Sequence, residues 1–539
     1  MNPQLATDAF YDKVVASAVS YAHHNVSASS TGTFASSQEK SQDLFMATDV
    51  IFDMNENGAV EGCHVRLDRF YLNLTVFGGD SVVHLKGSEC QTLTSIDRTF
   101  DQPLNLDVST FIQQNIGIEN HRELVIYARG GAKQKSAVLA WDTMMSGIAP
   151  DNTPLVVHEI RDAVKGTLLE KYSDTKTFMN TGWPQKPLRG VLEMTPTSTS
   201  ALETQMQVLA SVVGGIGNTL YSGQVHTLVT TLENGVYYLK DGYRNGHYTT
   251  NMKNNTSGTG ITFTDKDNIW GNSRTSDFVT AATDAHYGHQ VTFEYYLNIF
   301  GRQGIWNSAK GAFSRVHYGK KYDNAFWDGS KMTYGDGGTK FKPLVALGVV
   351  GHELTHGVTE ATCNLIYSGE SGGLNEATSD IFGTMIRFYG GTSPDWLIGA
   401  EIVLQSGLGR NFLRSMIQPS SDGTSWDCYC NGIGNSNVHA SSGVANHFFY
   451  LLSEGTVMGV PSRTCNPWDC KIASGGGTLT GIGKDKAAAI WYRALTRYFT
   501  TSTNYSNARR ATIYAATDLY PGGAEVEGVK SAWTAVRVY

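Results

Sequence analysis

The spacing of apolar residues changes once along this 539-residue chain, close to Asp277. Before that point apolar and polar residues alternate over short runs, as in residues 65–83, which is typical of half-buried strands. After it the apolar positions fall on one helical face, as in residues 293–300. The sequence therefore predicts an α+β protein with antiparallel sheet in its first part and mainly helix in its last part.

A chain of this length is too long for one ordinary hydrophobic core, so we expect two or three domains. Residues 195–200, rich in Thr and Ser around a proline, are the best candidate for a linker. Residues 123–128 and 136–142 resemble a hairpin, and residues 487–498 and 526–536 are the clearest late helices.

Charge and hydropathy exclude two classes of partner. The 49 acidic residues outnumber the 42 basic ones, and there is no basic stripe of the kind that binds a phosphate backbone, so we expect no nucleic acid partner. The longest apolar runs are far shorter than the roughly 20 residues that a bilayer requires, so we expect no membrane span. Asp8, Asp12 and Lys13 interrupt the region where a secretory signal would need an apolar core.

The chain has seven cysteines, an odd number that leaves at least one thiol outside an intramolecular disulfide. Cys63 with Cys90 and Cys465 with Cys470 are plausible local pairs, whereas Cys428 and Cys430 are too close to pair with each other. Together with the low charge content and five glycosylation sequons, this cysteine usage favours an oxidising, secreted setting.

The run His352-Glu353-Leu354-Thr355-His356 carries the clearest chemistry in the chain. It follows Pro343 within a stretch, residues 344–362, that we expect to be helical. His352 and His356 then lie one turn apart on the same face and can both bind one zinc ion, with Glu353 beside the open coordination position.

A third ligand is expected twenty residues later. An apolar stripe through residues 374–388 predicts a helix that places Glu376 and Asp380 together on a neighbouring face. One carboxylate can bind the metal while the other holds a histidine. Two imidazoles and one carboxylate leave a zinc ion with net positive charge, which suits a Lewis acid.

Residues 351–389 resemble the thermolysin family of zinc metalloendopeptidases, the gluzincins. The resemblance extends over most of residues 205–539 and includes further motifs at residues 284–287, 322–327, 334–337 and 481–486. It implies a two-lobed catalytic domain, with a β-rich N-terminal lobe at 201–355 that includes the start of the zinc helix. A helical C-terminal lobe at 356–539 would follow, with the zinc site in the cleft between them.

The resemblance also implies roles for single residues. One catalytic zinc ion would be bound by His352, His356 and Glu376, with Glu353 as general base. Asp380 and Asn375 would lie behind the ligands, and Asp380 would orient His352. Tyr367 and His439 would donate to the oxyanion that develops during peptide hydrolysis.

The resemblance also implies which residues would contact a peptide substrate. Asn324, Ala325 and Arg414 would hold the peptide backbone. An apolar pocket for the residue after the scissile bond would be lined by Phe341, Leu344, Val349, Ile398 and Leu413. The expected partners are therefore polypeptides cut before a bulky apolar residue, and the enzyme is expected to act as a monomer.

Residues 1–200 resemble the propeptide of the same family, with two small α+β modules at about 30–115 and 116–195. This segment would act as an intramolecular inhibitor and folding aid of a zymogen. The mature enzyme would begin near Ala201, after self-cleavage in or close to residues 195–200.

Calcium is the largest departure from the family. Relatives have acidic residues where this chain has Gly348, Arg387, Leu397 and Ala400, and only Asp395 of that cluster remains. Because calcium takes six to eight oxygen ligands, we expect the family's main calcium site to be lost, while calcium elsewhere stays possible. We expect the guanidinium of Arg387 to fill the vacated volume and pair with Asp395.

Two other interpretations remain open. In one the protein is a non-catalytic binder, which the presence of all three ligands and the base argues against. In the other it is a structural zinc protein, but structural sites usually fill the fourth position with Cys or His, and no such ligand is evident.

Overall fold

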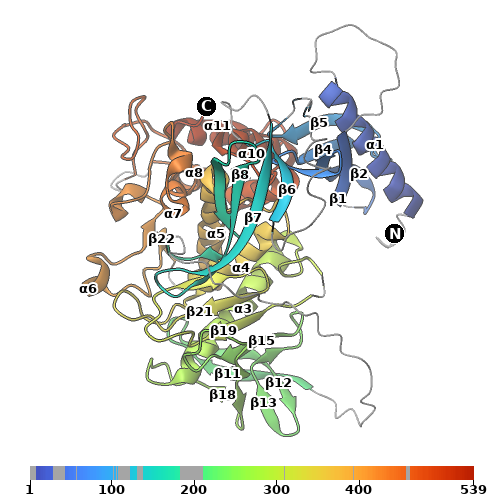
Figure 1. The fold of residues 1–539 in the computed structure, drawn as a ribbon. Coiled ribbons are helices and arrows are strands. Elements are labelled where there is room, and N and C mark those ends of the chain that lie inside the picture. The colour runs from blue at the N-terminus through green and yellow to red at the C-terminus, as the bar shows by residue number, and fades with distance from the viewer. Residues whose placement is uncertain are drawn as a thin grey trace.

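The computed structural model describes residues 8–27, 43–55, 57–100, 102, 104, 106, 122–129, 137–182, 211–308, 310–391, 394–456 and 462–539. The expected linker at 195–200 and the expected mature start at Ala201 lie outside these residues. Figure 1 shows the N-terminal strands beside the C-terminal helices, with a second group of strands at the other end of the molecule. No helix in the described part is long and apolar enough to cross a membrane.

The N-terminal region, as far as it is described, forms one nine-stranded sheet in the order β5-β4-β2-β3-β6-β7-β8-β9, with β1 also paired to β2. All of its pairs are antiparallel except β3 with β6. The predicted hairpin is confirmed as β6 and β7. The strands are β1 (Asp43–Met54), β2 (Val60–Tyr71), β3 (Leu74–Phe77), β4 (Ser81–Lys86), β5 (Thr92–Arg98), β6 (Arg122–Tyr127), β7 (Val138–Ile148), β8 (Pro154–Asp162) and β9 (Leu168–Ser173).

Helix α1 (Asp8–Ser27) packs against this sheet and lies before the expected start of the first module at about residue 30. Its buried positions are Val14, Ala18 and Ala22, which repeat every four residues. The sequence pattern predicted only strands in this part of the chain. The small side chains of this helical stripe give a weak apolar signal, which explains the omission.

The central part carries two further sheets and a long helix, α3 (Phe278–Phe300), which begins after the Asp277 N-cap. One sheet has the order β10-β20-β21-β19-β15-β14, with β16 paired to β15, and the other has the order β17-β13-β12-β11-β18. The strands are β10 (Lys176–Thr177), β11 (Ser211–Asn218), β12 (Gln224–Glu233), β13 (Val236–Tyr238), β14 (Lys240–Asp241), β15 (His247–Asn251), β16 (Ile261–Thr262), β17 (Thr264–Asp265), β18 (Ile269–Trp270), β19 (Phe313–Val316), β20 (Ala325–Trp327) and β21 (Lys331–Tyr334).

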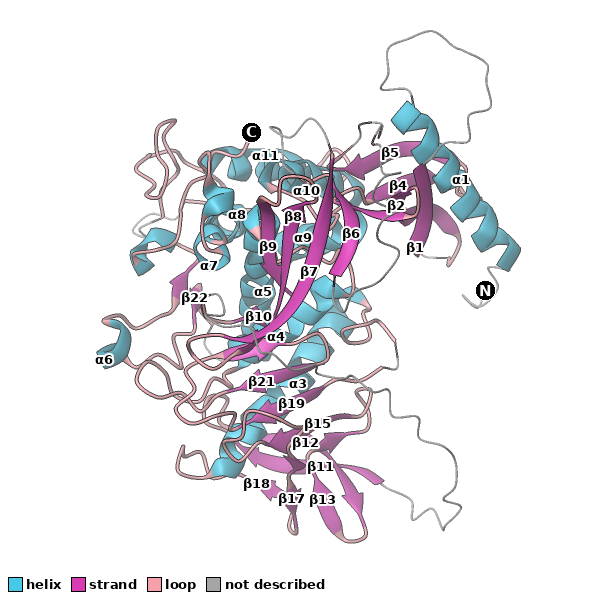
Figure 2. Ribbon diagram, viewed as in Figure 1, coloured by secondary structure: helices cyan, strands magenta, loops and turns pink. Residues whose placement is uncertain are grey.

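The C-terminal part is mainly helical, as Figure 2 shows. The three helices expected over residues 344–362, 487–498 and 526–536 are confirmed as α4 (Leu347–Glu360), α9 (Lys484–Arg497) and α11 (Ala524–Ala535). The other elements are α5 (Gly369–Gly390), β22 (Leu397–Ile398), α6 (Gln405–Leu408), β23 (Arg414–Ser415), η3 (Pro419–Asp422), η4 (Ile433–Asn435), α7 (Val438–Ser441), α8 (Gly443–Glu454) and α10 (Tyr505–Leu519). The expected division into a β-rich part followed by a helical part is therefore confirmed.

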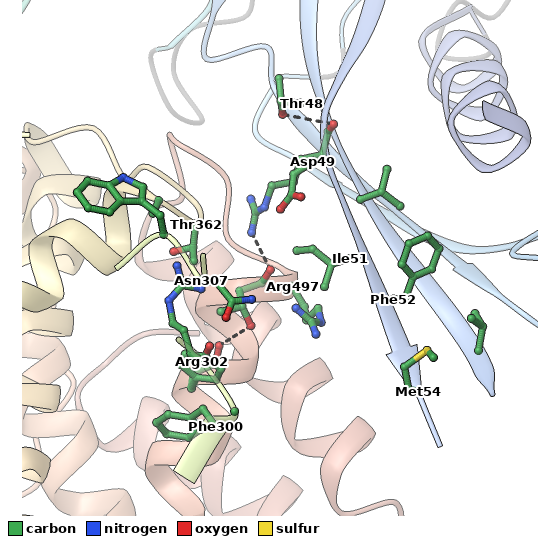
Figure 3. Close-up of a pocket in the computed structure, with 18 of the residues that line it drawn as sticks. Thr48, Asp49, Ile51, Phe52, Met54, Phe300, Arg302, Asn307, Thr362 and Arg497 are labelled. Carbon is green, nitrogen blue, oxygen red and sulfur yellow. Dashed lines mark hydrogen bonds between the residues drawn. The ribbon is translucent and has the colours of Figure 1, made fainter. Parts of the chain in front are cut away.

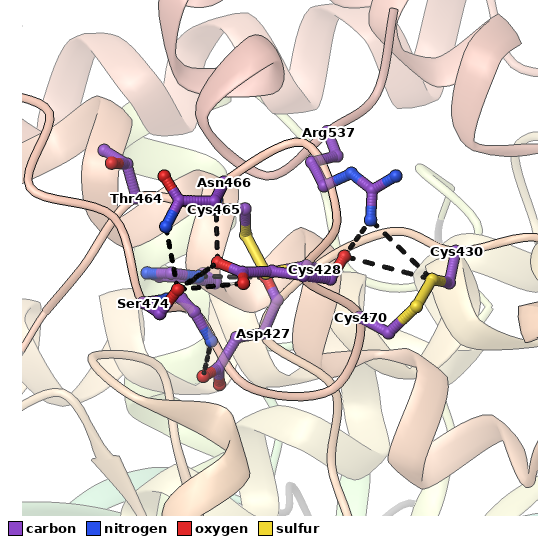
Figure 4. The surroundings of a disulfide bond; sticks show 12 residues. Asp427, Cys428, Cys430, Thr464, Cys465, Asn466, Cys470, Ser474 and Arg537 are labelled. Atoms are coloured by element: carbon purple, nitrogen blue, oxygen red, sulfur yellow. Dashed lines mark hydrogen bonds between the residues drawn. A yellow bond between two sulfur atoms is a disulfide. The ribbon is translucent and has the colours of Figure 1, made fainter.

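The disulfides correct one expectation (Figure 4). Cys63 pairs with Cys90 as expected, but Cys465 does not pair with Cys470. Instead Cys428 pairs with Cys465 and Cys430 with Cys470, and the backbone N–H of Cys428 donates to the carbonyl of Cys470 at 3.1 Å. The two loops run alongside each other, so each cysteine meets a partner across them. Cys363 is free and buried.

A cluster of charged groups joins the N-terminal sheet to the C-terminal helices; we call it the histidine cluster. His64 of β2 and His84 of β4 face each other with their Nδ1 atoms 2.6 Å apart. Their Nε2 atoms lie 2.9 Å from Asp53 and 3.0 Å from Asp97. These carboxylates reach the arginines of the helices: Asp53 is paired with Arg493 and Arg497 of α9, and Asp97 with Arg510 of α10.

A cavity of about 1000 Å³ lies beside this cluster (Figure 3). Ile51 and Phe52 of β1 line one side, and Phe300, Arg302 and Arg497 line the other. The two regions thus meet through localised contacts and leave open space between them.

Candidate active site

Helix α4 places His352 and His356 one turn apart, both fully buried. Helix α5 brings Glu376 against them: its Oε2 lies 3.6 Å from His352 Nε2, and its Oε1 lies 3.4 Å from His356 Nε2. The two helices approach closely at glycines. A Cβ on Gly383 would lie 2.6 Å from the carbonyl oxygen of Gly348, so no larger residue fits there without movement.

The hydrogen bonds behind the two histidines fix which nitrogen faces the site. His352 Nδ1 lies 3.0 Å from Asp380 Oδ1, and His356 Nδ1 lies 2.8 Å from Asn375 Oδ1. Both partners are acceptors, so each Nδ1 carries the proton and each Nε2 presents a lone pair. The Asn375 amide is held in this orientation because its nitrogen donates to the carbonyl of Leu365 at 2.8 Å.

These residues fit a divalent cation. The two Nε2 atoms lie only 3.1 Å apart, so their lone pairs converge together with the carboxylate of Glu376. Glu376 Oε2 and both carboxylate oxygens of Glu353 are buried and have no hydrogen-bond partner. Such a concentration of unpaired acceptors is unfavourable unless a cation compensates it, and the donor set of two imidazoles and one carboxylate suits zinc.

Asp380 anchors a buried network behind the ligands. Arg414 donates to it through Nε at 2.9 Å and Nη2 at 2.7 Å, and Asn446 of α8 donates through Nδ2 at 2.9 Å. Although burial alone would raise the pKa of Asp380, Arg414 and His352 hold it well below its usual value. Asp380 is therefore a carboxylate that fixes the ring of His352. No sequence motif singled out Asn446.

Two further side chains face the same point. Tyr367 OH is hydrogen-bonded to Glu376 Oε1, and His439 Nε2 lies 3.4 Å from Glu376 Oε2. His439 is held by Asn437, whose Oδ1 lies 3.1 Å from its Nδ1. The structure thus brings together both residues that were expected to donate to an oxyanion, from α7 and from the turn before α5.

A segment of the N-terminal region, residues 176–180, runs through this site; we call it the cleft segment. Its strand β10 pairs antiparallel with β20, with Lys176 opposite Trp327 and Thr177 opposite Phe326. The carbonyl oxygen of Thr177 lies 2.6 Å from His439 Nε2 and 3.3 Å from Tyr367 OH. No sequence pattern predicted this contact, because a two-residue strand has no recognisable period.

The residues expected to hold a peptide backbone all contact the cleft segment. The N–H of Phe178 donates to the carbonyl of Ala325 at 3.0 Å, and Arg414 Nη1 donates to the carbonyl of Phe178 at 3.0 Å. Asn324 accepts from the N–H of Met179 at 3.0 Å and donates to its carbonyl at 3.3 Å.

The side chain of Phe178 is fully buried, with its ring edge-on to His352 at a centroid distance of 5.0 Å. It belongs to one large apolar cluster together with the five residues expected to line a pocket, Phe341, Leu344, Val349, Ile398 and Leu413. A Cβ built on Gly399 would meet Leu413, Ile402 and Phe178, which places these three side chains next to one another. Ile402 was not among the expected residues.

Arg387 has the pairing that was expected. Its Nη1 lies 3.0 Å from Asp395 Oδ1 and 2.9 Å from the carbonyl of Leu397, and its Nε lies 2.7 Å from Glu401. A Cβ on Gly348 would lie 2.6 Å from Arg387 Cδ, so the arginine stem fills the space beside that glycine.

Comparisons with known proteins agree with this geometry. Residues 214–360 match the family model of the thermolysin metallopeptidase catalytic domain, and residues 363–538 match that of its alpha-helical domain. The solved structure of the precursor of protealysin, a metalloproteinase from Serratia proteamaculans, is 28% identical over 54% of this chain and 87% of that one, with a TM-score of 0.42.

Three curated relatives are more similar in sequence. A transglutaminase-activating metalloprotease from Streptomyces mobaraensis is 38% identical over 92% of this chain, which spans 61% of that relative. Bacillolysin from Bacillus cereus is 34% identical over 94% of this chain and 87% of the relative. Thermolysin from Alicyclobacillus acidocaldarius subsp. acidocaldarius is 34% identical over 88% of this chain and 83% of the relative. The chain therefore belongs to the thermolysin family of zinc metalloendopeptidases.

Proposed function

We propose that this protein is the secreted precursor of a zinc-dependent endopeptidase that cuts before bulky apolar residues, and that residues 1–200 are its propeptide. One observation carries the proposal: a peptide bond of the chain itself lies at the expected oxyanion donors, with the side chain that follows it packed against the expected ligand His352. Each expected backbone contact is made to that segment.

The chain's own residues divide the work of hydrolysis. His352, His356 and Glu376 hold the metal, which when bound lowers the pKa of water and polarises the scissile carbonyl. Glu353 accepts the proton of the attacking water and returns it to the leaving nitrogen. Burial, with a further contribution from Glu376, raises the pKa of Glu353 well above its usual value.

Tyr367 and His439 supply hydrogen-bond donors at the carbonyl oxygen, where negative charge develops. Their position is fixed before substrate arrives, since Tyr367 is anchored on Glu376 and His439 on Asn437. Donors that need no rearrangement stabilise the transition state more than the ground state.

The preference for an apolar residue after the scissile bond follows from the surroundings of Phe178. The pocket is formed by Leu413 and Ile402 and closed by the rest of the apolar cluster. A charged side chain placed there would lose its hydration without a partner.

The remaining features fit a secreted zymogen. The N-terminal region fills the cleft and so blocks other substrates, and three disulfides suit an oxidising compartment. Arg387 takes the position of the family's main calcium cluster, with its guanidinium among oxygens of Asp395, Leu397 and Glu401. We expect the mature enzyme to act as a monomer.

Casein cleavage by the purified mature protein, after removal of residues 1–200, tests the function. We expect activity that is lost with a zinc chelator, restored by zinc and reduced by at least about 1000-fold in Glu353→Gln. Glu527→Gln, on the exposed part of α11, is the matched control and should behave as wild type. A wild-type protein that binds zinc but cleaves nothing after removal of residues 1–200 would contradict the proposal and favour the non-catalytic binder.

A further inference from the structure

We infer that the Thr177–Phe178 peptide bond is the first bond that this peptidase cuts, and that it cuts it in its own chain. The inference rests on the proposed function and changes the expected place of self-cleavage. The bond lies well before residues 195–200, where the composition of the chain suggested a linker.

The contacts define which bond lies at the reacting position. Only one carbonyl of the cleft segment, that of Thr177, is within hydrogen-bond reach of both His439 Nε2 and Tyr367 OH. The next carbonyl, that of Phe178, is bound by Arg414, and the next, that of Met179, by Asn324. The bond that follows the Thr177 carbonyl is therefore the one presented for attack.

The N–H groups give the same register. Phe178 donates to the carbonyl of Ala325, and Met179 donates to Asn324 Oδ1. With the antiparallel pairing of β10 and β20, these bonds fix both the direction and the position of the segment. A shift by one residue would move every side chain to the opposite face and would expel Phe178 from its pocket.

The side chains agree with this register. Phe178, a bulky apolar residue, follows the bond and is fully buried against His352 and Leu413. Its neighbours differ, since Met179 is only partly buried and Asn180 is exposed. The cleft segment thus places the bulky apolar side chain of Phe178, the fully buried one of its two apolar side chains, in the apolar pocket.

The chemistry is hydrolysis of an amide. The hydroxyl of one water adds to the Thr177 carbonyl carbon, the C–N bond to Phe178 breaks, and the remaining water proton passes through Glu353 to the Phe178 nitrogen. The products are a chain ending in the Thr177 carboxylate and a chain beginning with the Phe178 amine.

Intact-mass measurement tests the inference on the full chain. Protein purified in the presence of a chelator and then supplied with zinc should yield fragments 1–177 and 178–539 as its first products. Phe178→Asp should slow this cut at least about 100-fold because a charge enters the apolar pocket, while Phe178→Leu should keep it. Val164→Asp is the matched control, since Val164 is an exposed apolar residue of the N-terminal region that lies outside the site.

A second measurement does not depend on activity. In metal-free Glu353→Gln protein, the amide hydrogens of Phe178 and Met179 should exchange slowly with solvent, and Phe178→Asp should remove that protection. If both amides exchange freely in Glu353→Gln protein, the segment does not occupy the cleft and the inference fails.

The two proposals fail in different ways. A protein that cleaves casein and cuts itself first at another bond, such as one within residues 195–200, overturns the inference and leaves the peptidase function standing. A zinc-loaded protein that cuts neither casein nor itself overturns both.

Discussion

Two of the attachments between the N-terminal region and the catalytic part differ in kind. They are not the whole interface, since Arg66 also donates to the carbonyls of Phe499 and Thr496, and Asp80 accepts from Thr501. At the cleft segment most contacts are hydrogen bonds to its main chain around one buried phenylalanine, with one ion pair between Lys176 and Glu360. At the histidine cluster they are ion pairs between side chains: Asp53 with Arg493 and Arg497, and Asp97 with Arg510. The first attachment includes a covalent bond that the enzyme can break, whereas the second survives that break.

This difference implies that cutting and release are separate events. Cleavage after Thr177 removes the connection at the cleft but leaves the histidine cluster unchanged. The N-terminal fragment should then stay bound as an inhibitor until the charges of the cluster are disturbed. Each attachment can be weakened without the other, which allows four predictions.

The largest effect is expected from the cleft. His439→Ala should slow cleavage at Thr177–Phe178 by roughly 100- to 1000-fold, because one donor to the developing oxyanion is lost. Intact mass followed over time measures the rate, and His226→Ala, an exposed histidine of β12, is the control. Retention of the fragment after the cut should not change. If His439→Ala protein cuts at the wild-type rate but loses the fragment early, the cleft controls retention of the fragment and not its cleavage, which contradicts the prediction.

The next effect concerns the histidine cluster. Asp53→Asn leaves the guanidinium of Arg497 without its anionic partner, and should weaken binding of the cleaved fragment roughly 100-fold, or about 3 kcal/mol. Glu61→Gln, at an exposed position of β2 in the same sheet, is the matched control. Size-exclusion chromatography of the cut protein at decreasing concentration gives the dissociation constant. An unchanged constant would mean that other contacts, such as those of Arg66 with the carbonyls of Phe499 and Thr496, hold the regions together.

Acidification should release the fragment more gradually. The Nε2 atoms of His64 and His84 both face carboxylates. Their Nδ1 atoms lie 2.6 Å apart and share one proton in a hydrogen bond. A second proton there would force two N–H groups against each other. Burial, partly opposed by Asp53, lowers the pKa of His64 to about 4. The other groups that face the pair are Asp53, Asp97, Arg493, Arg497, Arg510 and Tyr498.

The sign of the pH dependence follows from that shift. Between its ordinary pKa near 6.5 and about 4, His64 takes up a proton in the released fragment but not in the complex, so binding weakens as the pH falls. We expect a loss on the order of tenfold by pH 5. Dissociation measured between pH 7 and pH 5 tests this, and His64→Gln should flatten the profile. A profile that is equally steep without His64 would assign the effect to another group.

The smallest effect serves as a reference for both attachments, because Arg387 lies in neither. Arg387→Met should lower the free energy of unfolding by about 1–3 kcal/mol, since it leaves the Leu397 carbonyl and two carboxylates without their cation. Cleavage and fragment retention should stay as in wild type. Millimolar calcium should not raise the unfolding temperature of the wild-type protein; a clear rise would show that a calcium site remains.

The sequence predicted those parts of the site whose spacing is set by one helix. His352 and His356 must stand one turn apart to share a metal, and Glu376 and Asp380 lie one turn apart on the next helix. Such local geometry is visible in a pattern of residues. The same holds for the change from strand to helix after Asp277, which N-caps α3.

Contacts set by tertiary structure could not be predicted in this way. Asn446 reaches Asp380 from α8, and Phe178 reaches His352 from the N-terminal region, with no periodic pattern to indicate either. The pairing of Cys465 was mistaken for the same reason. A close neighbour in sequence seemed the natural partner, but the partner lies on an adjacent loop, at Cys428.

The short connection between β9 and β10 determines the kinetic order of self-cleavage. Ser173 ends β9 and Lys176 begins β10, so the nine-stranded sheet holds the Thr177–Phe178 bond close to a rigid element of the same molecule. A substrate presented in this way needs no encounter with a second chain, and its reaction is unimolecular. The half-time of self-cleavage should therefore be independent of protein concentration. Each chain undergoes a single turnover on itself, which begins when its metal site is filled.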